Sequence, residues 1–215
     1  MTRKYYLVGI LLTVAAFVAT LIAYPHLPNL VPTHWNFKGQ ADDYSAKWAL
    51  FLLGPASMAG LMVLFRFLPW LSPKHWEVDT FRSTYLYIML VLLCMLAYFN
   101  GLILWAGFGR PINVGRAIIG GFCLLFALLG NVLGKVRRNF YIGVRTPWAL
   151  ANERVWNATH RFAAKTFVVG GLLGLALTAV GVDGWPTLAS LMAGALIPVV
   201  YSLVFYKQLE RRGEL

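Results

Sequence analysis

The chain has 215 residues, of which 59% are hydrophobic and only 13% are charged. Soluble domains contain about 45–50% apolar and about 25% charged residues, so this chain has too few polar side chains to cover a globule in water. The composition excludes a soluble enzyme and a disordered chain, and it indicates an integral membrane protein. The Lys and Arg residues behind the net charge of +11 lie between apolar runs. There they serve topology and contact with anionic lipid rather than direct nucleic-acid binding.

Six apolar runs are long enough to cross the hydrocarbon layer as helices, which takes about 20 residues each. They predict an all-α integral membrane protein with six transmembrane helices, organised as a single membrane domain over residues 1–215. Pro55 and Pro198 are expected to kink the second and the sixth helix or to free a carbonyl there. The predicted spans are residues 5–23, 48–71, 83–105, 117–134, 166–182 and 184–206.

The distribution of Lys and Arg orients these helices. With a cytoplasmic N-terminus, 14 cations lie inside, seven of them in the loop over residues 135–165, and four lie outside. Cytoplasmic loops carry the excess of Lys and Arg. We therefore expect both termini and residues 135–165, the inner loop, in the cytoplasm, and residues 25–47, the outer loop, on the other side of the membrane.

This topology argues against catalysis. It separates the four histidines, two on each side, so they cannot form one metal site. The sequence has no zinc-hydrolase motif, serine nucleophile elbow or phosphate-binding loop. None of the eight acidic residues falls in the middle of a predicted span. We expect no cofactor, no metal site and no catalytic residue.

The outer loop has an unusual composition. Three prolines predict that its first part is extended, and Gly39 permits a tight turn after them. A titratable ring, a large aromatic face, an amide and a carboxylate occur close together in the residues His34, Trp35, Asn36 and Asp42. These four residues are the candidate site for a ligand that arrives from outside. Alternatively, Trp35 belongs to the aromatic belt at the membrane interface and its neighbours only form a turn.

The inner loop contains a predicted helix start, with Thr146 as N-cap and Pro147 as the first helical residue. We expect this helix to run to Lys165 and to continue into the fifth span. Helical spacing places on one stripe Glu153, Trp156, Asn157, His160 and Arg161. A separate apolar stripe, suited to the headgroup layer, comprises Trp148, Ala151, Val155 and Phe162. The cations of the loop are able to hold anionic lipid by themselves, at about 1 kcal/mol each near the surface, so lipid and partner binding both remain open.

Residues 139–150, NFYIGVRTPWAL, followed by Trp156 and Thr159-His160-Arg161, resemble the signature of the SdpI family of bacterial membrane proteins. The outer Pro32-Thr33-His34-Trp35-Asn36 resembles the motif of a membrane domain of unknown function that often occurs in the same proteins. The resemblance implies a multi-pass protein of the bacterial cytoplasmic membrane. It further implies immunity to a secreted, membrane-active peptide toxin, with a cytoplasmic transcriptional repressor as a second partner.

With the resemblance, the inner loop becomes a candidate surface for a partner or for anionic lipid. Its candidate binding residues are Asn139, Arg145, Trp148, Glu153, Trp156, His160 and Arg161. Its candidate structural residues are Gly143, Thr146 and Pro147. The resulting hypothesis is an immunity or sensor protein that binds or neutralises the toxin and relays its presence inward. The alternatives are a carrier of a small or lipidic substrate, with Pro55 and Pro198 at a cavity, and a membrane hydrolase or transferase that uses Glu153 and His160.

Overall fold

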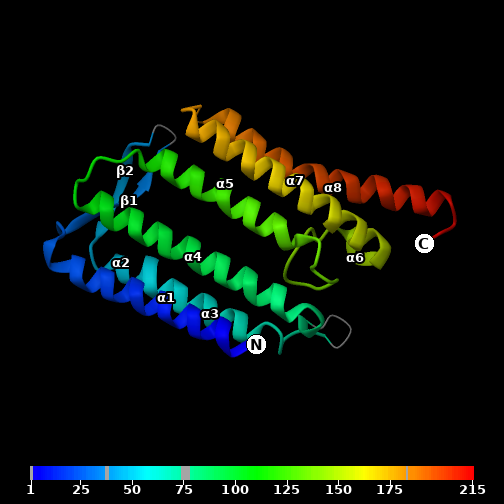
Figure 1. Ribbon diagram of the computed structural model, residues 1–215, viewed down its shortest axis with the longest axis horizontal. Helices are drawn as coiled ribbons and strands as arrows, with labels where there is room; N and C mark the ends of the chain where they lie inside the picture. The colour runs from blue at the N-terminus through cyan, green and yellow to red at the C-terminus, as the bar shows by residue number, and fades with distance from the viewer. Residues whose placement is uncertain (1, 37–38, 74–77, 183) are drawn as a thin grey trace. The chain divides into compact units, whose positions relative to one another are not determined.

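The computed structural model describes residues 2–36, 39–73, 78–182 and 184–215 (Figure 1). Two cations of the charge count, Lys38 and Lys74, lie outside the described residues. Within these ranges six helices are long and apolar enough to cross a membrane, and they confirm the prediction of an all-α, multi-pass membrane protein. Their bounds are Thr2–His26, Ala49–Phe67, Val78–Gly107, Val114–Leu133, Glu153–Ala179 and Trp185–Arg211.

The chain forms two compact units that interleave in the sequence. The first consists of Met1–Arg66 and Leu86–Gly121, and the second of Phe67–Tyr85 and Phe122–Leu215. Two long helices, α4 (Arg82–Gly107) and α5 (Val114–Leu133), each contribute residues to both units.

In the first unit, the second membrane-spanning helix is irregular where the sequence has a proline. It consists of α2 (Ala49–Phe51), the π-helical turn η2 (Leu52–Ala56), which contains Pro55, and α3 (Ser57–Phe67). Pro55 lacks the N–H that a regular α-helical turn requires, so the helix widens into a π-helical turn, a form of irregularity that the sequence analysis did not specify.

A buried polar pair lies beside this turn. The side-chain amide of Asn100 in α4 donates to the hydroxyl of Thr20, 3.2 Å away in α1 (Thr2–Ala23). Gly54 faces the Asn100 side chain so closely that a Cβ would overlap it. The pair satisfies two polar groups that water cannot reach.

The outer loop forms a β-hairpin that the sequence analysis did not predict. After the short 3₁₀ turn η1 (Tyr24–His26), β1 (Leu30–Trp35) pairs antiparallel with β2 (Ala41–Ala46). The expected extended part and the turn at Gly39, whose φ is +75°, are both present. The pairing of the two segments as strands was not predicted from the sequence. Pro32, which has no N–H to donate, and the irregular register near His34 weaken the strand pattern in the sequence. At its base, the hairpin buries Val31 in a small apolar cluster with Ala23, Leu27, Leu50 and Leu104.

The second unit contains η4 (Val78–Phe81), α6 (Pro147–Ala151) and the long pair α7 (Glu153–Ala179) and α8 (Trp185–Arg211). The two long helices approach closely through small residues, since Gly170 lies against Gly194 and the carbonyl of Ser190. The Thr166 hydroxyl donates to the Gly194 carbonyl at 2.8 Å. The helix α8 continues through Pro198. Since Pro198 has no N–H, it leaves free the carbonyl of Gly194 four residues earlier, and this is the carbonyl that accepts from Thr166, in agreement with the second of the two expected effects of this proline.

One prediction about the inner loop is wrong. The helix that begins at Pro147 ends at Ala151 instead of running to Lys165, and α7 begins separately at Glu153. Between them, Asn152 has an extended backbone, and its side chain accepts from the N–H groups of Arg154 (2.8 Å) and Val155 (3.3 Å). An Asn side chain that caps a helix competes with continuation of the preceding one.

The predicted apolar stripe also differs from the structure. Val155 is fully buried, and Phe162 stacks on Tyr201 of α8 with the ring centroids 4.5 Å apart. Val155 therefore packs inside the second unit instead of facing lipid headgroups, and the half-buried Phe162 is partly covered by α8. The helical spacing is correct, but spacing alone does not reveal which face another helix covers.

Candidate functional site

The outer hairpin brings two of its predicted site residues together. His34 Nδ1 and Asp42 Oδ1 lie 2.5 Å apart across the two strands, with 66% and 42% of their side chains exposed. The carboxylate orients the imidazole, and both groups remain accessible to a ligand. An exposed pair of this kind contributes at most about 1 kcal/mol to stability, so it is not required to hold the hairpin together.

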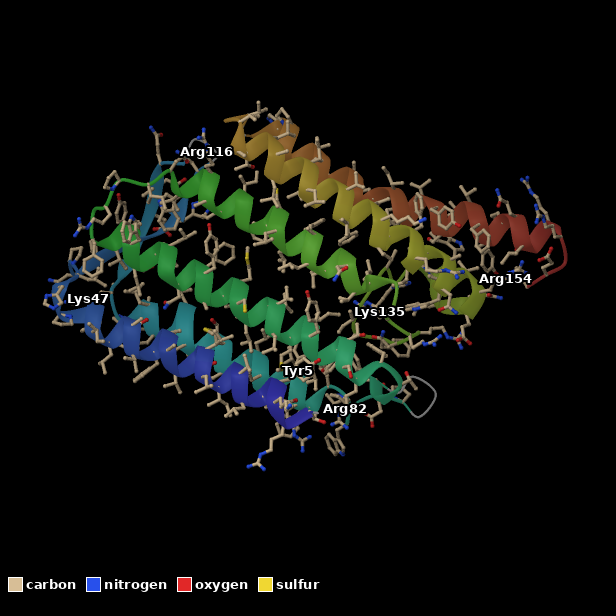
Figure 2. All side chains as sticks on the ribbon, viewed as in Figure 1. Tyr5, Lys47, Arg82, Arg116, Lys135 and Arg154 are labelled. Carbon is tan, nitrogen blue, oxygen red and sulfur yellow. The ribbon has the colours of Figure 1, made fainter. Side chains whose placement is uncertain are left out.

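The base and the tip of the hairpin are both held in place. At the base, Lys47 Nζ donates to the carbonyls of Tyr24 and Leu27, each at 3.2 Å, and lies over the Tyr24 ring. At the tip, Gly39 packs so closely on Gly115 of α5 that a Cβ on Gly115 would come within 2.9 Å of the Gly39 Cα. Figure 2 labels Lys47 and Arg116, which mark these two places in the chain.

The other two predicted residues of the hairpin have different environments. The backbone N–H and carbonyl of Asn36 bond to Gln40 and Gly39 respectively, and its side-chain oxygen accepts from the Gln40 N–H at 3.1 Å. Asn36 therefore shapes the turn. Trp35 is half-buried at the end of β1 and leaves part of its ring accessible. The hairpin thus presents an aromatic surface and a carboxylate–imidazole pair on a fixed frame.

In the inner loop, two predicted binding residues are buried in the second unit. Trp156 and His160 are 0% and 1% exposed, and their rings stack with the centroids 3.9 Å apart. The Trp156 indole donates to the Val136 carbonyl at 2.8 Å. His160 Nε2 accepts from the Val144 N–H at 3.0 Å, and its Nδ1 lies 2.9 Å from the Trp156 carbonyl. The imidazole is therefore the neutral Nδ1–H tautomer, because an N–H donor requires a lone pair on Nε2.

Asn139 is a third predicted residue whose side chain is buried by the loop itself. Its side-chain oxygen accepts from the N–H groups of Tyr141 (2.7 Å) and Ile142 (2.8 Å). Its amide donates to the carbonyls of Arg137 (2.8 Å) and Ile142 (3.1 Å). These four hydrogen bonds all go to the loop backbone, so Asn139 determines the shape of this segment.

The predicted structural residues have the expected surroundings. Thr146 Oγ1 accepts from the Ala149 N–H at 3.2 Å as the cap of α6, which begins at Pro147, and also bonds to Ser202 Oγ of α8 at 2.8 Å. Gly143 has a φ of +115° and leaves no room for a Cβ beside the His160 imidazole.

The remaining predicted residues lie at the surface of the second unit. Arg145, Glu153 and Arg161 are exposed, and Trp148 is half-buried. The Arg145 guanidinium donates to the Phe140 carbonyl and so folds back over its own segment. The residues predicted as one binding surface are therefore of two kinds, a buried group that builds the loop and an exposed group that is available for contacts.

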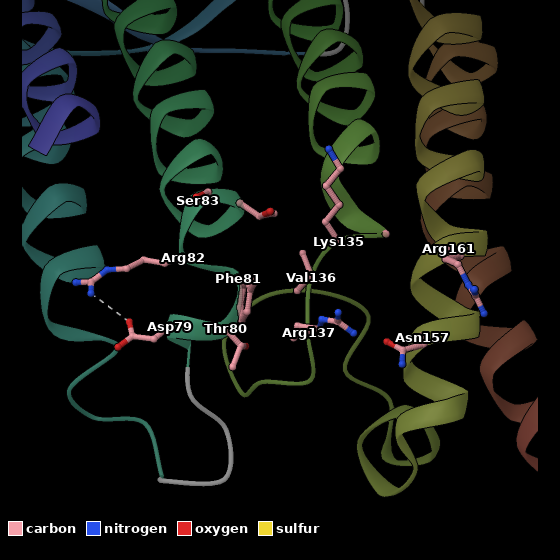
Figure 3. A pocket seen from close by; sticks show the side chains of 12 residues that line it. Asp79, Thr80, Phe81, Arg82, Ser83, Lys135, Val136, Arg137, Asn157 and Arg161 are labelled. Atoms are coloured by element: carbon pink, nitrogen blue, oxygen red, sulfur yellow. Dashed lines mark ion pairs between the residues drawn. The ribbon is translucent and has the colours of Figure 1, made fainter. Parts of the chain in front are cut away.

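Near this loop the structure has a cavity that sequence reasoning missed, which we call the basic cavity. It has a volume of about 680 Å³ and lies within the second unit (Figure 3). Figure 2 shows Arg82 at the start of α4 and Lys135 just past the end of α5. In Figure 3, Arg137 and Asn157 point toward one another, and Arg82 turns toward Asp79. The lining residues are Asp79, Thr80, Phe81, Arg82, Ser83, Thr84, Gly134, Lys135, Val136, Arg137, Asn157 and Arg161.

The missed residues come from three parts of the chain that are far apart in sequence. In the sequence, the positive charge of the inner loop was the only signal of this cavity. That charge does not indicate that the start of α4 forms the opposite wall of the cavity. Among the described residues, no group of three or more His, Cys, Asp or Glu side chains is placed to hold a metal ion. The exposed hairpin and the basic cavity both offer groups for binding.

These features define a multi-pass helical membrane protein with a polar hairpin on one predicted side and a basic, internally bonded loop on the other. Residues 135–202 match the model of the SdpI/YfhL protein family, and residues 11–59 match a domain of unknown function, DUF1648. The chain is 29% identical over 170 residues to the Immunity protein SdpI of Bacillus subtilis (strain 168), with 79% of each chain covered. The resemblance to the SdpI family is thereby confirmed. No solved structure matches the chain.

Proposed function

We propose that the protein is an immunity protein of the bacterial cytoplasmic membrane that protects the cell against an extracellular, membrane-active peptide. The observation that carries this proposal is the 29% identity to a relative named as an immunity protein, which extends over 79% of both chains. Two separate matches support it: residues 135–202, which include the inner-loop signature, match the SdpI/YfhL family model, and residues 11–59 match the model of DUF1648.

In this proposal the outer hairpin is the element that contacts the peptide. It offers the exposed His34–Asp42 pair and the partly accessible Trp35 side by side. Aromatic residues with neighbouring charged groups are typical centres of binding energy at protein interfaces. Because the hairpin is anchored at Lys47 and packed at Gly39, little ordering is required when a ligand binds.

The inner loop is proposed to relay the bound state to a cytoplasmic partner such as a transcriptional repressor. Its exposed residues Arg145, Glu153 and Arg161 are available for charge-assisted hydrogen bonds with such a partner. The buried Asn139, Trp156 and His160 contribute by fixing the loop that presents these groups.

The proposal is tested by expressing the chain in Bacillus subtilis (strain 168) that lacks its own Immunity protein SdpI, and by counting survivors in co-culture with the parent strain. The chain is expected to restore survival, and Trp35→Ala is expected to lower protection at least about tenfold, as for a central interface residue. Trp48→Ala is the matched control, because Trp48 is 58% exposed in the same unit but lies outside the hairpin.

Full protection by Trp35→Ala at equal expression would indicate that Trp35 belongs to the aromatic belt and does not contact the peptide. If the wild-type chain is present in the membrane but does not protect the cells, the proposed immunity toward the toxin of the parent strain is contradicted. Accumulation of the peptide inside protected cells would favour the carrier alternative.

A further inference from the structure

The basic cavity holds positive charge that the described part of the protein does not compensate. Arg82 pairs with Asp79, the single carboxylate among the lining residues, at 3.3 Å. Lys135, Arg137 and Arg161 make no ion pair with any described residue. All three cations belong to residues that line this one cavity, and since neighbouring like charges repel each other, an anion bound near them lowers this repulsion.

The neutral groups of the cavity are also suited to an anion. Ser83 and Thr84 bring hydroxyl groups in the first turn of α4, and Asn157 brings an amide from α7. Guanidinium groups present several N–H donors in a plane, which matches the oxygens of a phosphoryl group better than those of a small halide. Phe81 and Val136 are the buried apolar residues of the lining.

The backbone that carries two of the cations is fixed by side chains outside the cavity. The Trp156 indole donates to the Val136 carbonyl, and the Asn139 amide donates to the Arg137 carbonyl, both at 2.8 Å. A site whose backbone is already ordered loses less entropy when it binds a ligand. Asn139 and Trp156 are therefore positioning residues for this cavity.

From these observations we infer that the basic cavity is a binding site for a phosphoryl group. It lies where α4 begins, α5 ends and α7 begins, at the predicted cytoplasmic ends of three membrane helices. Two sources of the same chemistry reach this level, the phosphodiester of an anionic phospholipid headgroup and the phosphate of a soluble compound. The volume of about 680 Å³ accommodates either of them. The inference is independent of the proposed immunity function.

The test uses the full chain purified in detergent, with two binding arms. In the first, native mass spectrometry measures the binding of dioleoylphosphatidylglycerol and, as a neutral comparison, dioleoylphosphatidylcholine. In the second, the thermal shift caused by sodium phosphate is compared with that of sodium chloride at equal ionic strength. The variant Lys135→Gln/Arg137→Gln/Arg161→Gln removes the three unpaired cations of the cavity. The matched control Lys165→Gln/Arg211→Gln/Arg212→Gln removes the same charge at exposed positions outside it.

The cavity variant is expected to lose at least about tenfold in affinity in the arm that binds, and the control variant less than about threefold. Binding of phosphatidylglycerol alone would assign the site to lipid headgroups, and a phosphate-specific shift would assign it to soluble phosphate compounds. Equal losses in both triple variants, or a wild-type chain that distinguishes neither pair of ligands, would overturn the inference. Arg137→Gln alone, at an exposed side chain, repeats the comparison if the triple variant does not fold.

Discussion

His160 Nε2 accepts a hydrogen bond from the Val144 N–H at 3.0 Å, and this bond joins the loop after α5 to the first turns of α7. The two residues are 16 positions apart, and both are buried. Together with the Trp156–Val136 bond, it explains how a segment without regular secondary structure keeps one conformation. Two backbone groups of the segment are satisfied by side chains of α7, and others are satisfied by the Asn139 side chain within the segment itself.

His160→Ala is expected to lower the free energy of unfolding by about 3 kcal/mol, because it leaves the Val144 N–H unpaired and opens a space beside Trp156. Denaturant titration of the protein in micelles measures the change. Thr159→Val is the control at the neighbouring position, where the described residues offer the buried hydroxyl no hydrogen-bond partner. That swap should be neutral or stabilising. Equal destabilisation by both variants would mean that the His160 bonds do not hold the loop.

Gly143→Ala is expected to destabilise the protein more than a positive φ alone explains. Gly143 has a φ of +115°, and a Cβ there would also overlap the His160 imidazole. Gly109 has a φ of +66° with no atom near its hypothetical Cβ, so Gly109→Ala measures backbone strain alone, about 1 kcal/mol. The Gly143→Ala/His160→Ala double variant no longer has this overlap. Its loss of stability should therefore be smaller than the sum of the losses measured for the two single variants. Strict additivity would contradict the contact.

Thr146→Ala should cost about 1 kcal/mol of stability, because the hydroxyl caps α6 by accepting from the Ala149 N–H. Thr146→Ser retains this acceptor and should recover most of the loss. Ser202→Ala removes the bond between α6 and α8 but leaves the cap, so the pair of variants separates the two contributions. If Ser202→Ala costs as much as Thr146→Ala, the bond to α8 rather than the cap explains the stability.

The six membrane helices, the helix start at Thr146 and the turn at Gly39 could be predicted because each has a local cause. These causes are apolar length, a side chain that caps its own helix, and a glycine where φ is positive. The break at Asn152 was missed, although its cause is also local. The helical spacing of the residues before and after Asn152 concealed that its side chain caps a new helix.

The features of the candidate sites that could not be predicted depend on contacts between distant parts of the chain. Spacing placed His160 and Arg161 on one stripe, but the loop covers His160 and leaves Arg161 exposed. The basic cavity joins Ser83 to Arg161, which no pattern within one segment indicates. The same holds for the hairpin, where only strand pairing brings His34 to Asp42.

Asp42→Asn should reduce protection about tenfold while it leaves the melting temperature unchanged, since the exposed pair with His34 adds little stability. Asp43→Asn removes the same charge one position away, where the carboxylate accepts from the Tyr44 N–H instead of from His34. The co-culture survival assay and the melting temperature are measured for both variants. Equal loss of protection by the two would indicate that net charge, and not the His34–Asp42 geometry, matters on this hairpin.

The predicted topology is tested with single cysteines in a variant without Cys94 and Cys123. An impermeant thiol reagent applied to intact cells is expected to label cysteines placed at Asp42 and Arg110. Cysteines at Asn152 and Arg211 should react only after lysis, because the positive-inside bias assigns them to the cytoplasm. All four positions are at least partly exposed, so lack of reaction cannot be attributed to burial. Labelling of Asn152 from outside would reverse the orientation. The hairpin would then face the cytoplasm, and it would no longer be available to an extracellular peptide.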